Sequence, residues 1–403
     1  MFRKSLTFIT AIAVTLLLAS CGSDKENDVE AGIAEVCESV FAEGKADSAA
    51  NLLIINDGTA SAAKGPFPEE LAADISSVSE QGGSLTIISV DGEGALSEIA
   101  AKDIALSTSG PRDRPSVAKL AEVMPTCIET LLSTLASPTA PGTDLHQSFA
   151  LASELITPET VVWLLSDFIP TAGQISLKAD DLSSDPQMIG TLFAKNVPLD
   201  FLGVPLKVDG IGNTHENLLT AHREWLKNFS VSLCEGWKFS GCENIDSSPI
   251  KALMDDDGKP EDFLPDFPTL EMHQINHGCA LDFPAAIIFA GDSAQLREDA
   301  SHVFAPAISM LQDNPNSTAI ITGHAASSPD HTQSELEDLS KRRAAAVGGL
   351  FEQNSIAESR VSLRGVGDSE PKAEDLDADG MQIESIAAGE RRVDIVIEGV
   401  ICE

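Results

Sequence analysis

Five oxygen-bearing side chains, supplied by three separate segments, form the most chemically suggestive set in this sequence. The motif DGTAS supplies Asp57, Thr59 and Ser61, a later PGTD motif supplies Thr143, and LLSDF supplies Asp167. Carboxylates and hydroxyls are hard ligands, which suit Mg²⁺ or Mn²⁺. We therefore expect a divalent-cation site built from these residues. The alternative is a set of polar turns that bind no ion.

The segments that must position these residues have the patterns of buried strands and of helices. Near-continuous apolar strands that alternate with helices predict an α/β fold with a doubly wound parallel sheet. In such a sheet the carboxyl ends of the strands meet at one crevice, which would bring the five side chains together. The strand candidates are residues 51–56, 84–90, 160–167 and 197–204, and the helix candidates are residues 117–135, 145–155 and 216–229.

This arrangement resembles the von Willebrand factor type A domain and its metal-ion-dependent adhesion site. That family uses a DxSxS loop, a separate Thr and a later Asp. Here Thr59 stands where the family usually has Ser, and Phe168 stands where its LTDG motif has Gly. The resemblance covers residues 33–242. It implies a metal-dependent site that accepts an acidic group from a protein partner, whose identity the sequence does not give.

A second mixed pattern, which predicts an α+β domain, occupies residues 277–403. Its strand candidates are residues 285–290, 318–322, 360–365 and 392–397, and its helix candidates are residues 294–311 and 333–353. Between the two domains, residues 243–276 are rich in Pro and acidic residues, so we expect a linker there.

Several ordered motifs make this second region similar to the OmpA-like peptidoglycan-binding domain. ITGH ends at His324, LSKRRAAAV begins at Leu339, a GxG motif begins at Gly365, and ERRV ends at Val393. The resemblance implies non-covalent binding of peptidoglycan.

The family holds the diaminopimelate of peptidoglycan between an Asp after GHx and the Arg of LSxxRA. A zwitterionic ligand suits one carboxylate and one guanidinium. Arg343 takes the Arg position, but Ala326 replaces the Asp, and Asp330 lies farther along a longer loop. We expect Arg343 and Asp330 to bind the ligand. The alternative for Arg343 is a surface ion pair with a nearby acidic residue of the same helix.

A DxDxDG motif within this domain has the spacing of a calcium-binding loop. Its carboxylates come from Asp375, Asp377 and Asp379, and Gly380 provides the turn. A bound Ca²⁺ is one interpretation, and a solvated acidic loop is the other.

The first residues of the chain have the three parts of a secretory signal peptide, over residues 1–20. The segment LASC ends at Cys21 and resembles the bacterial lipobox, in which the Cys is acylated and becomes the mature N-terminus. Residues 21–32 would then form a lipidated tether. This resemblance implies a lipid anchor in the cell outer membrane, with the domains on its periplasmic face. The alternative is an ordinary cleaved signal followed by a coincidental Cys.

Cysteine usage agrees with export from the cytoplasm, because an even number of Cys remains after Cys21 is set aside. Six Cys allow about 15 pairings. Pairing within each region favours Cys37–Cys127, Cys234–Cys242 and Cys279–Cys402.

Composition excludes several functions. The formal net charge of −37 repels phosphate backbones, so nucleic acid is not an expected partner. No nucleophile elbow surrounds Ser327 or Ser328 near His324, so we expect no enzymatic activity. The leading hypothesis is an outer-membrane lipoprotein that binds peptidoglycan and presents a metal-dependent partner-binding domain. The alternative is an envelope interaction or adhesion module that has lost peptidoglycan binding.

Overall fold

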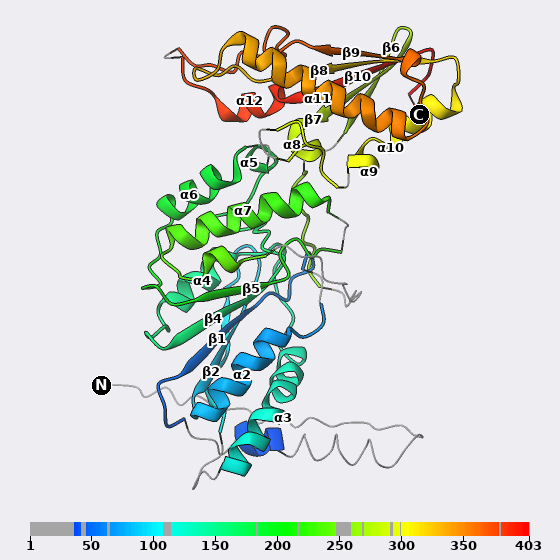
Figure 1. Cartoon of the computed structure of the whole chain (residues 1–403). Coiled ribbons are helices and arrows are strands. Elements are labelled where there is room, and N and C mark those ends of the chain that lie inside the picture. The colour runs from blue at the N-terminus through cyan, green and yellow to red at the C-terminus, as the bar shows by residue number, and fades with distance from the viewer. Residues whose placement is uncertain are drawn as a thin grey trace, which may run out of the picture.

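The computed structural model describes most of the chain and places two five-stranded sheets in two successive domains (Figure 1). The described ranges are residues 36–41, 46–62, 65–107, 114–182, 184–215, 218–246, 259–267, 270–290, 293–298, 300–378 and 380–402. The expected signal peptide, Cys21 and Asp379 lie outside them.

The first sheet has the strand order β3-β2-β1-β4-β5 and is mixed rather than fully parallel. Strands β2, β1, β4 and β5 run parallel to one another, whereas β3 pairs antiparallel with β2. The connection from Val90 to Ser97 holds no helix, and a parallel return needs a crossover of about a dozen residues or more. The strands are β1 (Asn51–Asn56), β2 (Ser84–Ser89), β3 (Glu98–Ala105), β4 (Thr160–Leu165) and β5 (Leu206–Asp209).

Helices cover both faces of this sheet, as its central strand requires. Leu52 and Ile54 of β1 enter one apolar core, and Leu53 and Ile55 enter the other, because successive side chains of a strand point to opposite faces. Helices α2 (Glu69–Gln81) and α3 (Arg114–Ser133) close the first core; α4 (Leu145–Ser153), α6 (Pro186–Asn196) and α7 (Thr220–Gly236) close the second, and α5 (Ala179–Leu182) precedes α6.

The second sheet has the order β6-β7-β10-β8-β9, in which only β8 and β9 are parallel. Helices α10 and α11 pack against it through one shared core. The strands are β6 (Glu271–Ile275), β7 (Gly278–Pro284), β8 (Thr318–Gly323), β9 (Val361–Gly365) and β10 (Arg392–Glu398); the helices are α8 (Ala285–Ile288), α9 (Ala300–Val303), α10 (Ala305–Asp313), α11 (Gln333–Gln353) and α12 (Glu384–Glu390).

Three segments differ from the sequence-based expectation. Residues 197–204 form a loop, in which Pro198 lacks a donor for a sheet hydrogen bond and Leu202 has a φ of 56°. The expected strand at residues 285–290 is mostly helix α8, because β7 uses the preceding residues and Pro284 caps the helix. The end of the expected linker forms β6, which pairs with β7.

Disulfides join the expected cysteine pairs. Cys37–Cys127 ties the segment before β1 to α3, Cys234–Cys242 joins α7 to the turn after it, and Cys279–Cys402 joins β7 to the end of the chain. The start of α7 reaches the second domain, where Ala221 joins its core and Glu224 forms an ion pair with Arg297. Within the described residues, we find no helix with the length and apolar character needed to span a membrane.

Candidate functional site

The two expected site carboxylates follow neighbouring strands. Asp57 comes directly after β1, and its backbone N–H donates to the carbonyl oxygen of Leu165, at the end of β4, over 2.9 Å. Asp167 comes two residues after Leu165. The chain leaves β1 and β4 toward opposite sides of the sheet, and this is where open α/β sheets form their binding crevices.

Hydroxyl groups surround the Asp57 carboxylate. Thr59 Oγ1 donates to Asp57 Oδ1 over 2.6 Å, and Ser166 Oγ donates to Oδ2 over 2.6 Å. Thr59 Oγ1 also lies 2.6 Å from Thr143 Oγ1, so the first and second motifs are in direct contact. The second motif approaches through a tight turn at Gly142, whose φ of 84° suits glycine.

Asp167 is buried and only partly satisfied. Its Oδ1 accepts the backbone N–H of Ile169 over 2.9 Å, but its Oδ2 has no donor within hydrogen-bond geometry among the described residues. The residue after it, Phe168, has a φ of 59° and a buried ring. Phe168 therefore adopts the left-handed conformation that a glycine would adopt easily, which accounts for its place at a position where the resembling family has Gly.

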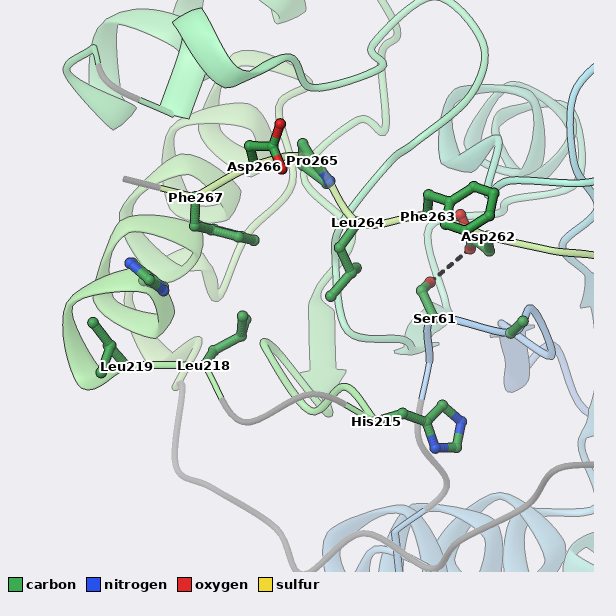
Figure 2. Close-up of a pocket in the computed structure, with 12 residues that line it drawn as sticks. Ser61, His215, Leu218, Leu219, Asp262, Phe263, Leu264, Pro265, Asp266 and Phe267 are labelled. Carbon is green, nitrogen blue, oxygen red and sulfur yellow. Dashed lines mark hydrogen bonds between the residues drawn. The ribbon is translucent and has the colours of Figure 1, made fainter. Parts of the chain in front are cut away.

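An unexpected third carboxylate enters the site from the segment between the domains. Asp262 Oδ2 accepts hydrogen bonds from Ser61 Oγ over 2.7 Å and from Thr143 Oγ1 over 2.6 Å, and its Oδ1 accepts from Thr171 Oγ1. Figure 2 shows the contact between Ser61 and Asp262 at the edge of the pocket. Because Ser61 has a single hydroxyl proton, this bond leaves Asp167 Oδ2 without it.

The three carboxylates make the site strongly electronegative. Burial raises the pKa of Asp57, hydrogen bonds from Ser166 and Thr59 partly oppose the rise, and the charge of Asp262 adds to it. Burial, followed by the charge of Asp57, raises the pKa of Asp167 well above its ordinary value. Hydrogen-bond donors are the groups that lower both pKa values.

These features fit a hard divalent cation. Buried carboxylates that repel one another and an acceptor oxygen without a donor are what such an ion would satisfy. In the described part of the chain, no three His, Cys, Asp or Glu side chains are arranged to hold an ion by themselves. Hydroxyl ligands from Thr59, Ser61 and Thr143 would therefore have to complete the set.

The structure thus brings the five expected residues to one place and adds residues that the sequence did not indicate. Thr171 follows the LLSDF motif closely, so its neighbourhood to Asp167 was a usable signal. Asp262 belongs to an acidic, Pro-rich segment, and only the apolar residues beside it, Phe263 and Leu264, hinted that the segment packs against a domain.

In the second domain, Arg343 lies on α11 and is almost fully buried, with 2% of its surface exposed. Its Nε donates to the carbonyl oxygen of Ser293 over 3.0 Å, and its guanidinium lies 5.2 Å from the centre of the Phe289 ring. These contacts fix the plane of the guanidinium, and they are not the surface ion pair that we considered for Arg343.

The other expected ligand residue, Asp330, is exposed on the loop before α11, and its described hydrogen bond runs from its own N–H to Ser328. A different carboxylate lies against the GHAA loop. Asp375 is buried, and its Oδ2 accepts the N–H of Ser327, directly after Ala326, over 2.8 Å.

The described part of the expected calcium loop uses its carboxylates on backbone amides. Asp375 accepts from Ser327, as above, and Asp377 Oδ1 accepts the N–H of Met381 over 2.8 Å. Asp379 lies outside the described residues. The described carboxylates stabilise a compact loop by hydrogen bonds of their own.

A charged network lies where β8 and β10 meet the loop before α12. Arg392 Nη1 lies 2.8 Å from Glu390 and its Nε lies 3.1 Å from Asp394, while His324 Nε2 lies 3.0 Å from Asp394. Burial alone would raise the pKa of Asp394, but the hydrogen bond with His324 and the charges of Arg392, His324 and Lys372 together lower it.

Comparison with known proteins decides the class of the second domain. Residues 288–384 match the model of the OmpA family. The second domain is OmpA-like. The match contains Arg343, Asp330 and Asp375, and β10 with its charged network follows it.

Solved structures similar to the OmpA-like region have low identity. The cell wall anchor of the T6SS from Pseudomonas aeruginosa is 22% identical, with 32% of this chain and 88% of that chain covered and a TM-score of 0.28. The OmpA-like domain of FopA1 from Francisella tularensis subsp. tularensis SCHU S4 is 17% identical, with 33% and 82% covered and a TM-score of 0.26.

A curated protein also shares a short similarity with this chain. Photosystem I P700 chlorophyll a apoprotein A2 of Gloeobacter violaceus is 28% identical over 121 residues. The similarity covers 30% of this chain and spans only 14% of the length of that protein.

Proposed function

We propose that this chain is an outer-membrane lipoprotein that binds peptidoglycan non-covalently through its OmpA-like domain. Its first domain presents a cation-dependent site for an acidic group of a protein partner, and the proposal assigns no catalysis to either domain. The observation that carries the peptidoglycan part is the family match over residues 288–384, with Arg343 at the family's arginine position.

The chemistry of Arg343 supports this proposal. A guanidinium offers a planar set of donors that suits a carboxylate, and diaminopimelate carries one beside an amino group. The Ser293 carbonyl and the Phe289 ring hold Arg343 in one orientation, so little conformational freedom is lost on binding. Asp330 is exposed on the neighbouring loop and is the carboxylate that we assign to the amino group.

Cosedimentation with insoluble peptidoglycan tests this part directly. The protein is residues 22–403, made in an oxidising compartment so that the disulfides form. Arg343→Ala should weaken binding about ten- to a hundredfold, because a hydrogen bond to a charged group contributes about 1.5–3 kcal/mol. Asp330→Ala should weaken it as well.

Matched variants separate binding from folding. Arg342→Ala removes the same charge from an exposed neighbouring position and should bind like wild type. Arg343→Lys keeps the charge and loses the planar donors, so it should bind weakly while melting close to wild type. Equal binding by wild type, Arg343→Ala and Arg343→Lys would refute the role of Arg343.

One observation favours the second candidate, an interaction or adhesion module without peptidoglycan binding. Ala326, at the position where the family has its Asp, is 5% exposed and offers no carboxylate. If wild type does not cosediment and Ala326→Asp does, the domain has lost the ligand through this replacement. Absence of binding by both proteins would also favour the module over the wall anchor.

The lipid anchor depends on Cys21 and is tested separately from either domain. Cys21→Ala should move the protein from the membrane fraction to the soluble fraction, since acyl chains supply about 0.8 kcal/mol for each buried CH₂ group. Sedimentation of the variant with membranes after a high-salt wash would contradict the anchor.

The first domain would use the crevice between β1 and β4. A bound Mg²⁺ or Mn²⁺ would supply an open coordination position for a carboxylate. Asp57 and Asp167 would hold the ion, and Thr59, Ser61 and Thr143 would contribute hydroxyl oxygens. The surplus of negative charge supports this proposal, because an ion would relieve the repulsion between the two buried carboxylates.

A further inference from the structure

The segment between the domains places an acidic side chain where an acidic partner group would go. Three hydroxyls donate to the Asp262 carboxylate, two of them over 2.7 and 2.6 Å. The backbone is fixed as well, because the N–H of Gly142 donates to the carbonyl oxygen of Glu261 over 3.1 Å. The site therefore already contains a bound carboxylate, from the same chain.

Apolar side chains anchor the rest of this segment to the first domain. Leu264 and Phe267 pack against its apolar core, and the Phe267 ring stacks on His222 with centroids 4.7 Å apart. Figure 2 shows both side chains pointing into the pocket toward Leu218, whereas Asp266 points away. The pocket has a volume of about 680 Å³ and reaches from Ser61 to the start of α7.

The pattern of exposure shows which side chains the surface selects. Phe263, between the two inserted residues Asp262 and Leu264, is 77% exposed. Asp262, Leu264 and Phe267 face the domain at spacings of two and three residues. This is peptide recognition by one polar anchor and two apolar anchors, which resembles the way extended peptides bind grooves.

We propose that the segment 261–267 is an internal ligand of the first domain, and that the external partner is an acidic peptide of the form D-x-L-x-x-F that must displace it. The inference rests on the proposed partner-binding function of this domain and names the chemistry of the partner. It depends on hydroxyl donors and an apolar pocket, so it does not require a bound cation.

Attachment to the same chain gives the internal segment a strong advantage. A tethered ligand has an effective concentration in the millimolar range, so a free peptide of equal intrinsic affinity competes poorly. If the site is free in one molecule of ten, the apparent affinity for the free peptide falls about tenfold. Removal of the internal carboxylate should restore that affinity.

A fluorescent peptide with the sequence of residues 259–267, KPEDFLPDF, is the probe. Fluorescence anisotropy measures its binding to the chain of residues 22–403. Asp262→Ala should bind the peptide about tenfold more tightly than wild type does. A peptide with Ala in place of its first Asp should bind neither protein. Glu261→Ala removes an exposed charge next to the anchor and should behave like wild type.

The outcomes distinguish this inference from the proposed cation site. Equal peptide binding by wild type and Asp262→Ala, with unchanged melting temperatures, would overturn the internal ligand. So would the absence of peptide binding to a folded Asp262→Ala or Asp262→Asn protein that still binds Mn²⁺ in calorimetry. Tighter binding by the variants in chelator would support the internal ligand and contradict cation dependence of the site.

Discussion

Each domain contains a group of buried or partly buried carboxylates, and the two groups are neutralised in different ways. In the OmpA-like domain, Glu390 and Asp394 face Arg392 at 2.8 and 3.1 Å, and the pKa of Asp394 is lowered. In the first domain, Asp57 and Asp167 face hydroxyls and backbone amides, and both pKa values are raised.

The difference separates a structural network from a binding site. The second group contains its own cations, so it is complete as folded and stabilises the junction of β8, β10 and the following loop. The first group adds a third carboxylate, Asp262, to a place where two already repel each other. Such a surplus costs stability unless a cation offsets it, which is typical of a site that awaits a ligand.

The largest effect should follow removal of a cation from the complete group. Arg392→Met leaves buried Glu390 without its partner, and breaking a buried pair in this way costs about 3–5 kcal/mol. Chemical denaturation measures the loss. Arg364→Ala, which breaks an exposed pair with Glu370, should cost at most about 1 kcal/mol. Similar losses for both variants would contradict the distinction between the pairs.

The same substitution should have opposite signs in the two groups. Asp167→Asn removes a repelled charge and should stabilise the first domain at pH 7 in chelator by about 1–2 kcal/mol, since one pKa unit corresponds to about 1.4 kcal/mol. Asp394→Asn removes a paired charge and should destabilise the second domain.

Tryptophan fluorescence makes the comparison specific. All three Trp residues, at positions 163, 225 and 237, lie in the first domain, so their emission reports its unfolding alone. The second domain is followed by hydrogen exchange of β8 and β10. A loss of stability for both Asp→Asn variants would remove the contrast between the two groups.

The pH dependence in chelator should differ by a smaller amount. The folded-state pKa values of Asp57 and Asp167 lie above the ordinary value of 3.8, so the native first domain binds protons more tightly than the unfolded chain. The stability that they contribute is present below pH 3.8 and is lost as the pH rises through the raised values. Lowering the pH from 7 toward 5 should therefore stabilise this domain by a few tenths of a kcal/mol per unit, below the limit of about 1.4 for one proton.

Asp394 should show the opposite behaviour. Its folded-state pKa is lowered, so its contribution is present above pH 3.8 and is lost only as the pH falls through the lowered value. The second domain should then show no change from Asp394 between pH 7 and 5. If both domains lose stability together in this interval, the raised pKa values in the first domain are wrong.

Sequence patterns predicted the elements with strong periodicity and clear ends. The expected strand at residues 51–56 is β1, and the expected helix at residues 333–353 is α11, which begins with a capping box between Thr332 and Glu335. The edge strand β3 was missed because its side chains are mostly exposed or half-buried and give no apolar alternation.

The candidate site was partly predictable for a geometric reason. Motifs that directly follow parallel strands must meet at the same edge of the sheet, so Asp57 and Asp167 were expected to be neighbours. Asp262 was not predictable, because it lies in a segment of exposed composition and its position depends on contacts of Leu264 and Phe267 with distant parts of the chain. Local sequence does not indicate where such a segment docks.

Titration with Mn²⁺, followed by electron paramagnetic resonance, tests most directly whether the first domain needs an external cation. Wild type should bind a single Mn²⁺ ion, Asp57→Asn and Asp167→Asn should lose that ion, and Asp394→Asn, which removes an equal charge from the second domain, should retain it. Equal binding by all four proteins would show that Mn²⁺ merely screens the acidic surface and would contradict a cation site between β1 and β4.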